Sequence, residues 1–194
     1  MRILIAIPTF ETIQPEVFKA IYDLQKPCDC DFEFIRGYDC AKARNKILEK
    51  AIKGKYDYCL MVDSDTVIPK DALINMLEKP VDVCLGFCPH KNTKEGKTEI
   101  HKPGEAWGDR YYYKDIPNEP RVKIRGGGAA CMLININRVI GSIQYPYFKY
   151  VVYDNGDHLS EDFYFCSQCR NRGLTLEADT RVRCGHLARY YQYE

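Results

Sequence analysis

Two aspartates separated by a single residue have the type and spacing of a metal site. Asp63-Ser64-Asp65 directly follows Tyr58–Val62, an apolar run typical of a buried strand. Carboxylate oxygens are the ligands that Mg²⁺ and Mn²⁺ prefer, and these ions keep positions open for substrate phosphates. The alternative is a solvated turn, or a cap for a helix that begins at Pro69. The position at the end of a buried strand favours the metal site.

A second acidic group, Ser160-Glu161-Asp162, opens a helical pattern that runs to Arg172. Acidic residues in the first turn of a helix stabilise it through its dipole, and either carboxylate could serve only that purpose. The other role is that of a general base, which takes a proton from an acceptor hydroxyl.

Two further motifs could take part in binding. His186 lies in a late strand pattern, where it is either a hydrogen-bonded core residue or an imidazole ligand suited to Mn²⁺. Gly126-Gly127-Gly128 either forms a flexible turn or lets backbone amides approach a ligand closely. No Gly-Lys-Ser/Thr follows, so this is not a Walker phosphate loop.

The chain contains ten cysteines, a high number for 194 residues. The apolar run Ile3 to Ile7 is too short for a signal peptide, and no run reaches the ~18 residues of a membrane span. We therefore expect a soluble cytoplasmic protein whose cysteines are mostly reduced and buried. Cys166 and Cys169 form a single C-x-x-C, which lacks the partner pair of a zinc site and is expected to pack on one helix face.

The first half alternates strand and helix patterns, which predicts βαβ units and a mostly parallel sheet. Ligands bind at the carboxyl ends of the strands in such sheets, and the Asp63 motif is at one of these ends. The expected strands are Arg2–Ile7, Asp31–Arg36, Tyr58–Val62 and Val81–Phe87, and the expected helices begin at Pro15, after an Asp39 cap, and at Pro69.

The second half has a different character. Its polar segment Pro89–Gly104 is expected to be a mobile surface loop. Arg110–Tyr113 and Arg121–Ile124 flank a Pro-Asn turn and predict a hairpin. The remaining expected elements are a strand over Ala129–Ile134, a helix over Glu161–Arg172 that ends before Gly173, and a strand over Val182–His186.

Length and charge limit the possible architectures. A chain of 194 residues predicts a single domain, which we divide into a nucleotide-binding half, 1–87, and an acceptor-side half, 88–194. Its net charge of +1 gives no overall attraction to nucleic acids or acidic membranes.

Taken in order, these motifs resemble family 2 glycosyltransferases of the GT-A fold, from Arg2 to about Leu187. That fold is α/β, with a mostly parallel central sheet flanked by helices. The similar segments are Ile5–Phe10, Ala43-Arg44-Asn45, Leu60–Pro69, Gly127–Ile134, Ser160-Glu161-Asp162 and Cys184–Leu187. Arg36-Gly37-Tyr38-Asp39 departs from the acidic motif that the family often carries after its second strand.

The resemblance implies roles for individual residues. Asp65 and His186 would hold Mn²⁺ or Mg²⁺ with the donor diphosphate, and Asp63 would contact the metal, its water or the ribose. Asp162 would be the catalytic base, with Glu161 as the competing candidate. The implied nucleotide-sugar site comprises Pro8, Thr9, Phe10, Arg44, Asp63, Ser64, Gly127 and Gly128.

The activity implied is hexose transfer from a nucleotide-diphosphate sugar, with UDP favoured over GDP, to an acceptor hydroxyl. The resemblance implies inversion, although some retaining enzymes share the motifs. A glycan, a lipid-linked sugar, a protein and a modified DNA base remain possible acceptors, and the oligomeric state is open. The alternatives are a sugar-nucleotide nucleotidyltransferase, which would need a glycine-rich basic loop where Pro8-Thr9-Phe10 stands, and a non-catalytic zinc module.

Overall fold

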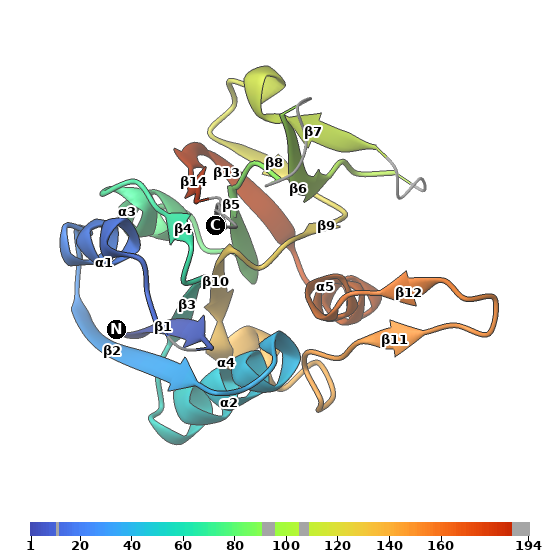
Figure 1. The fold of residues 1–194 in the computed structure, drawn as a ribbon, viewed down its shortest axis with the longest axis horizontal. Helices are drawn as coiled ribbons and strands as arrows, with labels where there is room; N and C mark the ends of the chain where they lie inside the picture. Colours follow the sequence, from blue (N-terminus) through green and yellow to red (C-terminus); the bar gives the residue numbers. More distant parts are fainter. Residues whose placement is uncertain (11, 91–95, 105–108, 188–194) are drawn as a thin grey trace, which may run out of the picture.

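The structure, a computed structural model, describes residues 1–10, 12–90, 96–104 and 109–187. Its centre is a seven-stranded sheet in the order β2-β1-β3-β10-β5-β13-β8, with helices on both faces (Figure 1). The strands are β1 Arg2–Thr9, β2 Asp29–Arg36, β3 Tyr58–Val62, β5 Val83–Phe87, β8 Arg121–Lys123, β10 Cys131–Asn135 and β13 Leu176–Arg183. The helices are α1 Pro15–Tyr22, α2 Cys40–Lys53, α3 Ala72–Leu77, α4 Ile136–Val139 and α5 Glu161–Asn171, with a 3-10 turn η1 at Tyr113–Asp115.

Five of the seven strands, β1, β2, β3, β5 and β13, run in the same direction, so the sheet is mostly parallel and the expected fold class is confirmed. β1 runs parallel to both β2 and β3, and β5 runs parallel to β13. β10 is antiparallel to both of its neighbours, β3 and β5, and β8 is antiparallel to β13. Strands from both sides of residue 87 therefore share one sheet.

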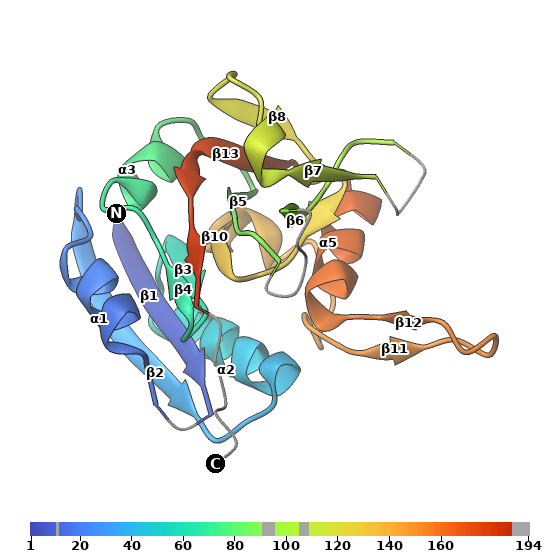
Figure 2. The same ribbon diagram turned by 45° about the horizontal axis from the view of Figure 1, so that its top comes forward.

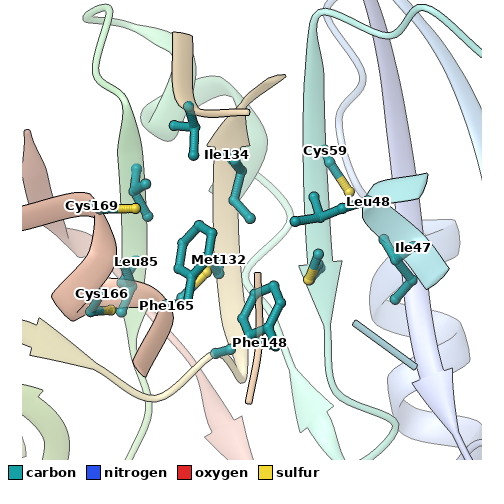
Figure 3. Close-up of a cluster of buried hydrophobic side chains, with 14 of the residues drawn as sticks. Ile47, Leu48, Cys59, Leu85, Met132, Ile134, Phe148, Phe165, Cys166 and Cys169 are labelled. Carbon is teal, nitrogen blue, oxygen red and sulfur yellow. The ribbon is translucent and has the colours of Figure 1, made fainter. Parts of the chain in front are cut away.

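Two apolar cores lie between the sheet and the helices that pack on its two faces. α2, α4 and α5 cover one face, and α1 and α3 cover the other. On the first face, Phe165 stacks on Phe148 with ring centroids 4.6 Å apart and lies beside Met132 (Figure 3). Cys166 and Cys169 are fully buried in the same core, where burial raises the pKa of both thiols. The C-x-x-C pair therefore packs as a pair of small apolar groups.

Local signals placed most helix ends correctly. The Asp39 side chain accepts a hydrogen bond from the Lys42 amide at 2.9 Å and caps α2, as expected. Gly173, with φ of 70°, follows the end of α5. The expected start of a helix at Pro69 is wrong, because α3 begins only at Ala72.

A second, three-stranded sheet corrects two expectations. It has the order β7-β6-β9, where β6 is Lys97–His101, β7 is Arg110–Tyr112 and β9 is Gly126–Gly127. The segment expected to be a mobile loop thus contains a strand, in which Thr98 and Ile100 are buried; residues 91–95 lie outside the described part. The expected hairpin is also wrong, because β7 pairs with β6 and β8 pairs with β13. Pairing with distant strands prevailed over the local turn signal.

Two short ladders complete the fold. β4, Thr66–Val67, pairs with β14, Gly185–His186. β11, Val151–Val152, pairs with β12, His158–Leu159, and this hairpin projects from the body in both ribbon views (Figures 1 and 2). We call residues 151–159 the arm. Among the described helices, none combines the length and the apolar character needed to cross a membrane.

Candidate active site

A cleft of about 570 Å³ lies at the carboxyl ends of β1 and β3, where ligands bind in sheets of this kind. β1 delivers Pro8 and Thr9 to it, and the turn after β3 delivers the acidic triplet. The lining residues are Pro8, Thr9, Phe10, Tyr38, Asp39, Cys40, Ala43, Asp63, Ser64, Asp65, His90, Glu99 and His186. The fold thus brings together residues that the sequence holds more than a hundred positions apart.

The β4–β14 ladder places His186 beside Asp65. His186 pairs with Thr66 across this ladder, and the Leu187 amide donates to the Asp65 carbonyl at 2.9 Å. Asp65 Oδ1 lies 3.5 Å from His186 Nε2, and their side chains are 20% and 15% exposed. The pair is therefore held by backbone pairing and is reached from the cleft.

The chemistry of this pair fits a divalent cation. His186 Nδ1 is 2.8 Å from the Pro89 carbonyl oxygen. A carbonyl can only accept, so Nδ1 carries a proton, which leaves Nε2 as the ring nitrogen that would bind a cation beside Asp65. A carboxylate oxygen with a neutral imidazole nitrogen suits Mn²⁺. Within the described residues no three His, Cys, Asp or Glu side chains gather as a metal site, so substrate oxygens and water would complete the coordination.

Arg44 forms a buried bridge behind the cleft. Its Nη2 donates to Asp63 Oδ1 at 2.8 Å, and its Nη1 donates to Glu161 Oε1 at 2.7 Å. Burial alone would lower the pKa of Arg44, but the two carboxylates outweigh it and raise that pKa. Burial raises the pKa of Asp63 and of Glu161, and Arg44 opposes both shifts. Arg44 thus ties the end of β3 to the start of α5.

This position differs from the one that the resemblance implies for Arg44. The side chain is 3% exposed and does not line the cleft, whereas Cys40 and Ala43 of the same helix do. A contact with the nucleoside remains a prediction, and the structure shows a residue that positions two carboxylates.

Asp162 lies close to this bridge. Its Oδ1 accepts from the Ser160 hydroxyl and, at 2.8 Å, from the Phe163 amide. A Cβ added at Gly128 would stand 3.5 Å from Asp162 Oδ2 and 3.0 Å from Glu99 Cβ. A Cβ added at Gly127 would stand 2.6 Å from the Ile100 side chain. These glycines therefore allow β9 to pack closely against β6, and a role in nucleotide-sugar binding remains a prediction.

Among the cleft residues that sequence reasoning did not place in the site are His90 and Glu99, whose side chains can ionise. His90 Nε2 lies 3.0 Å from Glu99 Oε1, and Arg110 Nη1 lies 3.3 Å from Glu99 Oε2. Both belong to the segment expected to be a loop. The alternation of Thr98 and Ile100 around Glu99 was the available strand signal, and its neighbouring lysines and glycine obscured it.

Comparison with known proteins gives a fold. No family model matches the chain, and neither does any curated protein. Three similar solved structures cover nearly all of it. A197 from STIV is 18% identical over 97% of this chain and 87% of its own, with a TM-score of 0.67. GalNAc-T7 with UDP, GalNAc and Mn²⁺ is 10% identical over 97% of this chain, with a TM-score of 0.68. S. aureus TarS 1–349 with UDP-GlcNAc is 13% identical over 99% of this chain, with a TM-score of 0.61.

The present chain spans 44% of GalNAc-T7 and 60% of TarS 1–349. At identities this low the likeness concerns the fold alone. The arrangement of sheet and helices matches that of these glycosyltransferases, and the chain has the GT-A fold.

Proposed function

We propose that this protein is a metal-dependent glycosyltransferase that moves a hexose from a UDP-sugar to an acceptor hydroxyl, with inversion at the anomeric carbon. The observation that carries the proposal is the pair of Asp65 and His186, 3.5 Å apart at the edge of a cleft at the carboxyl ends of the strands. Similar solved structures contain UDP with Mn²⁺, or UDP-GlcNAc, which supports this class of donor.

Asp65 Oδ1 and His186 Nε2 would hold the cation. A bound Mn²⁺ or Mg²⁺ supplies positive charge where negative charge develops on the departing diphosphate. The Pro89 carbonyl keeps the His186 ring in the tautomer that binds a metal, and the imidazole favours Mn²⁺ over Mg²⁺.

The loop after β1 would bind the nucleoside. The Thr9 hydroxyl donates to the Thr12 carbonyl at 2.6 Å and so shapes the loop. Phe10 is 73% exposed, and Tyr38 lines the same cleft, so both rings can stack on a nucleobase.

Asp162 would remove the proton from the acceptor hydroxyl. Of the two adjacent carboxylates, Glu161 is held by Arg44 and is only 8% exposed. Asp162 Oδ2 lies near Gly128 and Glu99, and Glu99 lines the cleft. Arg44 would act as a positioning residue, because it holds Asp63 and Glu161 in one arrangement.

The test measures donor binding through its effect on thermal unfolding. A panel of UDP- and GDP-sugars is compared with and without Mn²⁺, since a ligand that binds only the folded state raises its melting temperature. We expect stabilisation by a UDP-sugar that requires Mn²⁺, is lost in His186→Ala and is kept in the control Tyr22→Ala, which changes an exposed residue of α1 outside the cleft. Stabilisation by no UDP-sugar, or equal stabilisation without metal, would overturn the proposal.

A further inference from the structure

A second cleft, of about 830 Å³, adjoins the first. It lies between the arm, α5 and the β6–β7 sheet, and it shares His90 and Glu99 with the first cleft. Its volume is within the range of ~300–1,000 Å³ that ligand sites have. A molecule in the second cleft would therefore meet a donor in the first at this shared wall.

We infer that the second cleft binds the acceptor, and that the acceptor is a neutral, hydroxyl-rich glycan. The inference rests on the proposed function, in which the first cleft holds the donor. It names the substrate class that the fold by itself leaves open.

The polar groups of the second cleft suit hydroxyls. α5 contributes Ser167 and Asn171, whose side chains both donate and accept hydrogen bonds. Charges of both signs also line it: Arg110 and Arg170, Glu99 and Asp157. A sugar hydroxyl can donate to a carboxylate and accept from a guanidinium, so a polyol can form hydrogen bonds with groups of both charges.

The same lining disfavours the other acceptors. A polyanion such as DNA would bring phosphates against Glu99 and Asp157, and like charges at an interface cost binding energy. An acyl chain would remove these charged and amide groups from water and offer no hydrogen bonds in return, which is unfavourable. A neutral glycan meets neither penalty.

The arm adds an aromatic surface to this cleft. The ring of Tyr153 is half-exposed and lines the cleft. Its turn is ordered by hydrogen bonds: the Tyr153 amide donates to the Asp157 carbonyl at 2.8 Å, and Asn155 Nδ2 donates to Asp157 Oδ2 at 2.7 Å. Gly156 takes φ of 85°, which the turn requires. A rigid tyrosine can cover the C–H face of a sugar ring at little cost in conformational entropy.

The arm is not needed to complete a sheet. In the described part of the chain β11 and β12 pair with each other and with no third strand, and Val152 is 77% exposed. An isolated two-stranded hairpin adds little stability by itself. Contact of Tyr153 with the acceptor would give the arm a role that its own strand pairing does not.

The experiment uses the whole chain with UDP and Mn²⁺ on an array of neutral, phosphorylated and sulfated oligosaccharides, with single-stranded DNA as an added probe. We expect binding to neutral oligosaccharides. Tyr153→Ala should weaken that binding about tenfold, and Asn171→Ala should weaken it by a smaller factor. Tyr22→Ala changes an exposed tyrosine on α1 outside both clefts and should have no effect. Thermal unfolding of each variant checks that it is folded.

Preferential binding of DNA or of acidic oligosaccharides would overturn the inference, as would neutral-glycan binding that both cleft variants leave unchanged. Donor binding separates this failure from that of the proposed function. If the UDP-sugar stabilises the protein but neutral glycans do not bind, only the inference about the acceptor fails. If no UDP-sugar stabilises it, the proposed function fails first.

Discussion

In the described part of the chain, two clusters of arginine and carboxylate side chains can be compared, and their surroundings differ. Arg44, 3% exposed, joins Asp63 and Glu161. Asp179, fully buried on β13, accepts from Arg121 Nε at 3.3 Å and from Arg181 Nη2 at 2.8 Å. The first cluster adjoins a cleft at the carboxyl ends of the strands, and none of the three residues of the second lines either cleft.

The second cluster ties elements together. Arg121 also donates to the carbonyl of Asn75, in the last turn of α3, and to that of Lys79, which follows the helix. It thereby satisfies carbonyl groups that a helix end leaves without partners. The comparison teaches that buried charge by itself does not mark a functional site; what the charge orients, and whether that group reaches a cleft, decides the role.

The largest expected effect concerns the cleft. Asp65→Ala should lower transfer by about a thousandfold or more, because a metal supplies several kcal/mol of charge stabilisation. EDTA should inactivate the parent protein, and Mn²⁺ should restore the parent but not the variant. Asp71→Ala, a change before α3, is the matched control in the transfer assay. Full activity in EDTA would show that the cleft beside the Arg44 cluster does not work through a bound metal.

The next effect concerns the second cluster. Asp179→Asn should lower the free energy of unfolding by about 3 kcal/mol, because it removes the fully buried charge between two arginines and leaves the buried Arg121 with only the more distant Glu177 as a counter-charge. Urea unfolding measures this loss, and Asp29→Asn at the exposed edge of the sheet is the control. The affinity of the folded protein for the donor should not change. A large loss of donor affinity at unchanged stability would show that the two clusters do not differ in role.

Asp162→Asn tests which carboxylate near the Arg44 cluster is the catalytic base. It should lower the turnover rate about 100-fold and leave donor affinity nearly intact, because it removes basicity and keeps the shape. Glu161→Gln should instead reduce stability, since it weakens the bond to Arg44. Calorimetry with the donor and the transfer rate measure the effect of Asp162→Asn, and thermal unfolding measures that of Glu161→Gln. Unchanged turnover in Asp162→Asn would place the base elsewhere.

A smaller effect is expected from thiols that carry no charge. The double change of Cys166 and Cys169 to Ser should cost about 1–3 kcal/mol of stability, because it places hydroxyls in an apolar core. Elemental analysis should find the same zinc content in the parent and the variant. One zinc per chain in the parent, lost in the variant, would contradict the packing role.

The smallest effect belongs to an exposed ion pair. Asp31 accepts from the Tyr56 hydroxyl at 2.7 Å and from Arg2 Nη2 at 2.8 Å, and these bonds lower its pKa below the ordinary 3.8. Its contribution to stability is therefore fully present above pH 3.8 and is lost as the pH falls through the lowered pKa. Asp31→Asn should be slightly less stable near neutral pH and should converge with the parent in acid. An equal difference at every pH would contradict this linkage.

By itself, the sequence determined the elements whose signals are local. The apolar run of β3, the Asp39 cap of α2 and the acidic triplet after Val62 each depend on a few neighbouring residues. Periodicity and capping are short-range effects, so one stretch of chain is enough to reveal them. The order of these elements was also enough to predict the α/β class.

Only the tertiary structure decided which distant segments meet. It reversed β10 between β3 and β5, and it paired β7 with β6 where a local hairpin was expected. It turned Arg44 inward and brought Glu99 to the wall of both clefts. The family resemblance had implied that His186 and Asp65 meet, and a two-residue ladder is what holds them together. Strand pairing and buried ion pairs depend on complementarity between residues far apart in the chain, and no local pattern records it.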